Sequence, residues 1–260
     1  MKSPIQPGGA CLLPTYHLLV ERETGFVYSS TREQLESHLR KLISLRDESL
    51  LKLEPSVSFD DGHASQHRYA FPLLQKYGVK GIFFCIVGRA DKWPDYMKWT
   101  QMQELARAGH EVQSHGLTHR FLTRCTDAEL KEELYVSRTE LEQRLGITAD
   151  AISIPFGRWN RRVLLACVEA GYKRIFTSDP RPVSSFEGQA QVSGRFMVRR
   201  STTIDQLTQI VEADRKALFR LRTKHECKLL LRSVIGDDAY DRLWGFVGAR
   251  RSLNEAAKEY

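Results

Sequence analysis

Cysteine is scarce in this 260-residue chain, which also lacks long apolar runs, internal repeats and low-complexity tracts. The five cysteines are widely spaced and mostly in apolar surroundings: Cys11, Cys85, Cys125, Cys167 and Cys227. They predict buried thiols in a reducing compartment, not a disulfide framework. No run reaches transmembrane length. Residues 1–10, rich in Pro and Gly, do not resemble a signal peptide, although a removed leader would leave the same sequence. We expect a cytoplasmic protein, with membrane-peripheral contact as an option.

The charge balance is basic, with 39 Lys and Arg against 32 Asp and Glu and a net charge of +7. Such a balance favours an anionic partner, either a membrane surface or an acidic glycan. No nucleic-acid-binding motif accompanies it, so no nucleic acid is expected. The hydrophobic share of 42% is ordinary for a soluble globular protein with a buried core. The oligomeric state is open.

Strand-like and helix-like segments alternate along most of the chain. The expected strands are residues 11–20, 55–59, 81–87, 111–114, 151–154, 173–177 and 196–198. The expected helices are residues 31–43, 66–77, 99–108, 126–145, 160–170 and 203–221. This alternation predicts a parallel α/β sheet that closes into a barrel. Residues 179–195 are expected to form a long loop.

A basic, amphipathic stretch at residues 215–232 follows the alternating segments. We therefore divide the chain into a barrel domain, residues 1–210, and a basic helical C-terminal extension, residues 211–260. The helix could lie on an anionic membrane surface. The more ordinary interpretation, an appended helix with a solvated face, is favoured.

Two adjacent carboxylates stand at the end of the strand Pro55–Phe59. Asp60 and Asp61 are followed by Gly62. Like charges this close need a nearby cation or a raised pKa, and a metal ion would meet that need. A DD pair by itself is more often a solvated turn or a helix cap.

A pair of histidines, His115 and His119, follows the strand at residues 111–114. At a spacing of i, i+4 they would share one face of a helical turn and reach one ion together. Both motifs follow strands, where α/β barrels place their chemistry. One Asp and two His leave coordination positions open for water and substrate. Zn²⁺ is the expected ion, with Co²⁺, Ni²⁺ or Fe²⁺ as alternatives.

These motifs resemble those of a known family. Ser58-Phe59-Asp60-Asp61-Gly62 and Ser114–His119 are similar to the first two motifs of the polysaccharide deacetylase (NodB-homology) family of metal-dependent carbohydrate de-N-acetylases. The segments 71–84, 109–112 and 154–157 agree with the family pattern as well. The resemblance covers roughly residues 12–180. It implies an irregular (β/α)7-type barrel and a divalent metal.

The resemblance also implies roles for the residues. Asp61, His115 and His119 correspond to the metal ligands, and Asp60 to the catalytic base. Water would attack the acetamide carbonyl, and the metal and a backbone N–H near Phe156 would hold the oxyanion. An acid must then protonate the leaving amine.

Three family features are missing, of which the Asp-x-x-Asp-Trp motif is one. Residues 198–207 contain no histidine where the family has its C-terminal acid, and His17 in the first strand is the candidate. Tyr16-His17 resembles the circularly permuted branch that includes poly-N-acetylglucosamine deacetylases. His63 and His67 are weaker alternatives. The third motif carries Ser153 where an arginine should orient the base, and Arg158 or another arginine could substitute.

Aromatic and loop residues near these motifs are candidates for substrate binding. Pro155, Phe156, Trp159 and Trp99 are assigned this role because aromatic faces stack on sugar rings, although some will only pack. We predict a metal-dependent hydrolase that removes acetyl groups from an N-acetylated saccharide of a polysaccharide or its precursor. The alternatives are an O-acetyl carbohydrate esterase and a non-catalytic glycan-binding protein. A basic membrane-docking or nucleic-acid scaffold is more distant.

Overall fold

The computed structural model describes residues 12–48, 55–182, 184–236 and 239. Its centre is a nine-stranded sheet in the order β11-β1-β4-β5-β6-β7-β8-β10-β9. The strands are β11 (Arg195–Met197), β1 (Leu13–Tyr16), β4 (Ser56–Phe59), β5 (Lys80–Cys85), β6 (Glu111–Ser114), β7 (Ala151–Ser153), β8 (Arg174–Phe176), β10 (Ala190–Ser193) and β9 (Ser185–Glu187). All neighbours are parallel except β9 and β10. A small parallel pair, β2 (Leu18–Val20) and β3 (Ser29–Thr31), lies beside it.

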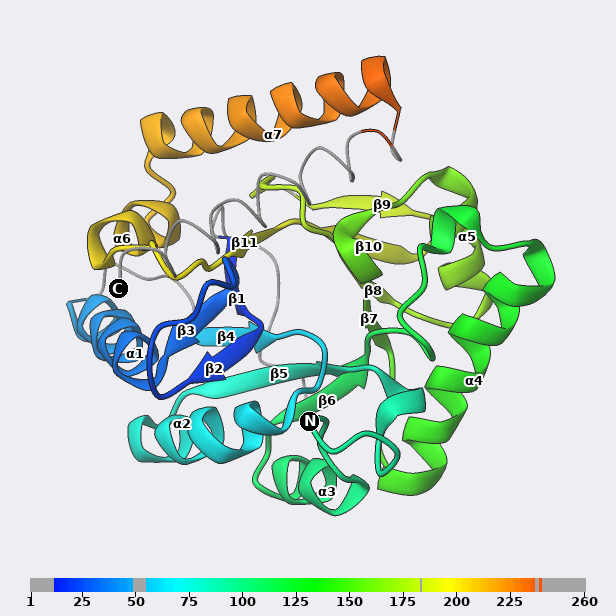
Figure 1. Ribbon diagram of the computed structural model, residues 1–260, viewed down its shortest axis with the longest axis horizontal. Helices are drawn as coiled ribbons and strands as arrows, with labels where there is room; N and C mark the ends of the chain where they lie inside the picture. The colour runs from blue at the N-terminus through cyan, green and yellow to red at the C-terminus, as the bar shows by residue number, and fades with distance from the viewer. Residues whose placement is uncertain (1–11, 49–54, 183, 237–238, 240–260) are drawn as a thin grey trace, which may run out of the picture.

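Helices cover the outer side of this sheet (Figure 1). They are α1 (Arg32–Asp47), α2 (Phe71–Tyr77), α3 (Trp99–Arg107), α4 (Asp127–Leu145), α5 (Arg161–Glu169), α6 (Ile204–Val211) and α7 (Arg215–Ile235). A π-helical turn, Gln66–Ala70, leads into α2. Thr126 caps α4 in a reciprocal capping box with Glu129, so the helix begins where the sequence predicted its start. In the part of the chain that the structure describes, no helix could cross a membrane.

The sheet is strongly curled. Arg195 on β11 and Ser153 on β7 are five strands apart, which on a flat sheet is about 24 Å. Their side chains nevertheless meet, with Nη2 2.7 Å from Oγ. Within the described residues the edge strands β11 and β9 are not paired with each other. The predicted parallel α/β sheet is confirmed, whereas its closure into a seven-stranded barrel stays a prediction.

The hydrophobic core lies between the sheet and its helices. Phe59 and Phe83 stack on neighbouring strands with ring centroids 4.8 Å apart. Leu35, Leu39 and Leu42 of α1 are fully or almost fully buried against the same cluster. This packing holds the carboxyl ends of β4 and β5 rigidly beside each other, and the carboxylate pair follows β4 directly.

Several expectations about local structure were wrong. Residues 179–195 are not one loop, because they contain the antiparallel strands β9 and β10. The first strand is interrupted at His17, between β1 and β2. The helix expected over residues 203–221 is two helices, which separate where Ala213 adopts a positive φ of 58°.

The thiol prediction is also only partly right. The side chains of Cys85, Cys125 and Cys167 are buried and free, but Cys227 is exposed. Cys11 lies outside the described residues.

Helix α7 is long and mostly exposed, and it lies across the top of the view in Figure 1. It packs inward through Leu218, while Phe219, Leu230 and Val234 are among its exposed apolar side chains. Contact with an anionic membrane and the domain boundary at residue 210 stay predictions. Most of the residues beyond α7 lie outside the described part of the chain.

Candidate metal and catalytic site

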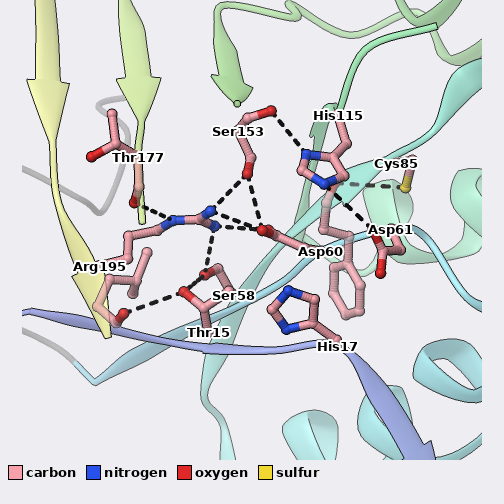
Figure 2. Close-up of polar contacts among 12 residues, drawn as sticks. Thr15, His17, Ser58, Asp60, Asp61, Cys85, His115, Ser153, Thr177 and Arg195 are labelled. Carbon is pink, nitrogen blue, oxygen red and sulfur yellow. Dashed lines mark hydrogen bonds and ion pairs between the residues drawn. The ribbon is translucent and has the colours of Figure 1, made fainter. Parts of the chain in front are cut away.

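The two adjacent carboxylates point to different places because the backbone turns between them. The N–H of Asp60 donates to the carbonyl of Tyr16 on β1, 2.9 Å away, and so continues the sheet by one residue. Asp61 then adopts a positive φ of 75°, a conformation that Asp tolerates better than most residues. Figure 2 shows Asp60 directed toward Arg195 and Asp61 toward His115. The next residue must be Gly, since a Cβ on Gly62 would come within 3.0 Å of the Cys85 backbone.

The two histidines lie on a loop, not on one face of a helical turn as predicted. His115 follows β6, and the chain then loops so that His119, at a φ of 64°, turns back toward it. The two rings are 4.9 Å apart. Nε2 of each histidine lies 3.4 Å from Oδ1 of Asp61. The predicted pairing is therefore confirmed, although a different backbone produces it.

Asp61, His115 and His119 fit a divalent metal ion. One donor atom from each residue lies within 4.8 Å of the others. Tetrahedral bonds of about 2.1 Å place donors roughly 3.4 Å apart, which is close to the separations found here. Nδ1 of His115 lies 2.8 Å from the carbonyl of Ser153, which can only accept. Nδ1 must therefore carry a proton, so Nε2 is the nitrogen of His115 that is left to bind an ion.

Local charge prepares these groups for binding. Burial by itself would raise the pKa of Asp61, but the hydrogen bond and charge of His115 lower that pKa to about 2. Burial, together with His115, lowers the pKa of His119 to about 4. At neutral pH the carboxylate is ionised and His119 is neutral, which are the forms that bind a metal.

Glu133 of α4 holds the histidine loop in place. Its side chain is almost fully buried, and its carboxylate accepts from the N–H groups of Leu117 (2.9 Å) and Thr118 (3.0 Å). The hydroxyl of Thr118 donates to the second carboxylate oxygen. Glu133 was not among the residues predicted from the sequence. A buried acid that satisfies three donors between His115 and His119 fixes the loop on which these two proposed metal ligands lie.

We expect Glu133→Ala to weaken Zn²⁺ binding by about 10- to 100-fold, the usual effect of removing a group that orients metal ligands. Competition with a chromophoric chelator measures this affinity. Glu132→Ala is the matched control, because its exposed side chain lies on the same helix. Equal affinities in the two folded variants would contradict the assigned role of Glu133.

Asp60 is held by an arginine that the sequence analysis did not identify. Its carboxylate is 4% exposed and forms a two-point ion pair with Arg195, Nη1 to Oδ1 at 2.7 Å and Nη2 to Oδ2 at 2.8 Å. Burial favours a raised pKa for Asp60, but the charge and hydrogen bonds of Arg195, together with the charges of His115 and His17, outweigh burial and hold that pKa well below its usual range. Arg158, the residue suggested from the sequence, instead lies 4.3 Å over the ring of Phe121.

His17 lies on the same side of the site. Figure 2 shows its ring beside the two carboxylates. Burial lowers the pKa of His17, although the charges of Asp60 and Asp61 act in the opposite direction. Its Nδ1 is buried without a hydrogen-bond partner. Tyr28 packs on the ring with centroids 5.2 Å apart. His63 and His67 have partners of their own, Ser65 for His63 and Glu104 for His67.

The predicted substrate-binding residues divide into two groups. Phe156, 52% exposed, follows Pro155 in a short turn at a φ of 58° and lies 4.3 Å from the ring of His119. Trp159 is also exposed, and its Nε1 donates to Asp179. Trp99 on α3 instead packs against the core, with the guanidinium of Arg144 5.0 Å over its ring. Contact with a sugar stays a prediction for Pro155, Phe156, Trp159 and Trp99. The contacts of Trp99 are those of a residue that packs in the core.

The segment that forms this site is similar in sequence to known polysaccharide deacetylases. Residues 54–175 match the family model "Polysaccharide deacetylase". YxkH of Bacillus subtilis (strain 168) is 30% identical over 132 residues, 51% of this chain and 47% of YxkH. Chitin deacetylase 2 of Cryptococcus neoformans var. grubii serotype A is 26% identical over 123 residues, 47% of this chain and 26% of that protein.

Among solved structures, BC0361, a polysaccharide deacetylase from Bacillus cereus, aligns with a TM-score of 0.67 at 21% identity. The alignment covers 77% of this chain and 68% of BC0361, and it supports the fold. The chain spans half or less of the length of the two curated relatives. The segment that matches the polysaccharide deacetylase family model, residues 54–175, carries the three proposed metal ligands.

Proposed function

We propose that this chain is a metal-dependent hydrolase that removes the acetyl group from an N-acetylated sugar of a polysaccharide or its precursor. The observation that carries the proposal is that the adjacent carboxylates of Asp60 and Asp61 face different partners. Asp61 faces His115 and His119, while Asp60 is held 2.7 Å from Arg195, out of the ligand set. A metal-dependent hydrolase of this kind needs such an arrangement. One carboxylate must bind the metal ion while the other accepts a proton from the attacking water.

Asp60 is the proposed general base. Both of its oxygens are bound by Arg195, yet a carboxylate has about four lone-pair sites and can still accept a proton from water. A divalent ion at Asp61, His115 and His119 would supply Lewis-acid chemistry, activating the water and polarising the acyl carbonyl. The backbone N–H near Phe156 is the proposed second support for the oxyanion.

His17 is the proposed general acid. It comes from the end of the first strand, and the charges of Asp60 and Asp61 both act on its ring. This position supports membership of the circularly permuted branch, in which the acid precedes the base in the chain. For this role His17 must enter the step protonated, a form that the charges of Asp60 and Asp61 favour. The imidazolium then passes its proton to the leaving amine, which cannot depart as an anion, while Asp60 holds the proton taken from water. In the cytoplasmic setting expected from the sequence, a lipid-linked or soluble precursor is the proposed substrate.

Acetate release from short N-acetylglucosamine oligomers tests the proposal. Protein loaded with Zn²⁺ or Co²⁺ should release acetate, chelation should abolish the release, and reloading should restore it. If metal-loaded protein releases acetate from neither these oligomers nor O-acetylated sugars, the enzyme proposal is wrong. The glycan-binding alternative, on the same fold, then takes its place.

A further inference from the structure

We infer that Arg195 is the residue that positions the base Asp60. It does so from β11, five strands away from the strand on which the family resemblance predicts such an arginine. That strand is β7, which carries Ser153 at the corresponding position. The inference rests on the proposed function, because it assigns Asp60 as the base. It adds a positioning residue from β11, outside the segment that matches the family model.

The contacts of Arg195 determine its orientation completely. A guanidinium has five N–H donors in a rigid plane. Nε donates to the carbonyl of Thr177 at 3.3 Å. Nη1 donates to Asp60 and to the hydroxyl of Ser58, and Nη2 donates to Asp60 and to the hydroxyl of Ser153 (Figure 2). The side chain is 1% exposed. All five donors therefore have acceptors, and the planar fork fixes both carboxylate oxygens of Asp60.

Ser153 makes room for this arrangement. It is fully buried, its Oγ accepts from Nη2 of Arg195 at 2.7 Å, and it donates to Oδ2 of Asp60 at 3.0 Å. A long side chain at position 153 would occupy the space that the guanidinium fills, because protein interiors are close-packed. The small residue on β7 and the large one on β11 therefore act as a pair. An arginine can approach Asp60 from either strand, but not from both.

The backbone at β11 is placed to support Arg195. Its N–H donates to the carbonyl of Asp179 at 3.1 Å. The preceding residue is Gly194, where a Cβ would lie 2.0 Å from the same carbonyl oxygen. Only glycine permits this approach of the chain to Asp179. The strand also pairs with β1, which ends next to His17, so neighbouring strands supply the arginine and the proposed acid.

Exchanging the two residues tests the inference. Arg195→Ser should lower kcat for acetate release by about 100-fold, a typical cost of misplacing a catalytic group, with metal content and KM little changed. The double variant Arg195→Ser/Ser153→Arg should have a kcat at least about tenfold higher than that of Arg195→Ser. Arg195→Lys, which keeps the charge but not the planar fork, should fold and still lose about tenfold. A double variant no more active than Arg195→Ser, with the same metal content, overturns the inference.

Arg174→Ser is the matched control. Arg174 is also a largely buried arginine with two carboxylate partners, Glu111 at 2.6 Å and Asp150 at 2.7 Å, near the amino ends of β6 and β7. Its loss should lower the melting temperature yet leave kcat within about threefold, because its partners lie far from the proposed base. An equal loss of kcat in this variant would mean that Arg195 acts only through stability, which overturns the inference.

Thermal unfolding separates a failure of the inference from a failure of the proposed function. If the wild-type protein releases no acetate, the function is wrong, but the exchange can still be judged. The double variant should then melt above both single variants, because each single change leaves either an unpaired acid or an overfilled interior. A double variant that melts no higher than the less stable single variant overturns the exchange.

Discussion

Replacing Asp60 with asparagine is expected to lower kcat for acetate release by about 100- to 10,000-fold, the range for loss of a general base. The change is almost isosteric, and its amide oxygen can still accept from Arg195. It removes the negative charge that would accept the proton of the attacking water. Because Asp60 does not belong to the Asp61, His115 and His119 group, the metal should stay bound.

Metal analysis and kinetics together decide this prediction. Asp60→Asn protein should carry as much Zn²⁺ as the wild type, whereas Asp61→Asn protein should lose the ion. Asp150→Asn is the control for removing a carboxylate from an ion pair with arginine, since Asp150 binds Arg174 away from the site. If metal-loaded Asp60→Asn retains more than a tenth of the wild-type kcat, Asp60 is not the base.

Elements with strong periodicity and clear end signals were predictable. The strand at residues 111–114 and the start of α4 at the Thr126 cap were found as expected. The three proposed metal ligands were predictable too, because each follows a strand and the carboxyl ends of parallel strands meet at one edge. Their loop conformation was not, since positive φ at His119 leaves no pattern in the sequence.

The residues missed by the sequence analysis depend on tertiary contacts. Arg195 reaches Asp60 across 135 positions of sequence, and only the curl of the sheet brings them together. One signal was available, an arginine in a short apolar strand, which must find an acid if it points inward. The β9–β10 hairpin was missed for the opposite reason. Ser185 and Phe186 of β9 are exposed and Glu187 is half-buried, so no alternation of burial marks them as a strand.

Replacing His17 with glutamine is expected to separate amide from ester hydrolysis. Cleavage of the N-acetyl group should fall by about 100- to 10,000-fold, the usual contribution of a general acid. Cleavage of an O-acetyl sugar should fall by less than about tenfold, because an alkoxide leaves more easily than an amine anion and depends less on protonation. No hydrogen-bond partner of the Nδ1 atom of His17 is lost, so the fold should tolerate the change.

Parallel assays on an N-acetylglucosamine oligomer and an O-acetylated sugar, at equal metal content, test this separation. His67→Gln is the control, because His67 is paired with Glu104, 2.8 Å away, and should be silent in both assays. If His17→Gln leaves both activities intact while His63→Gln abolishes amide cleavage, the acid is His63 and the permuted-branch proposal fails. If the wild type cleaves only the ester and His17→Gln leaves that activity unchanged, the protein is an esterase. The buried imidazole next to the carboxylates would then serve packing with Tyr28 instead of proton transfer.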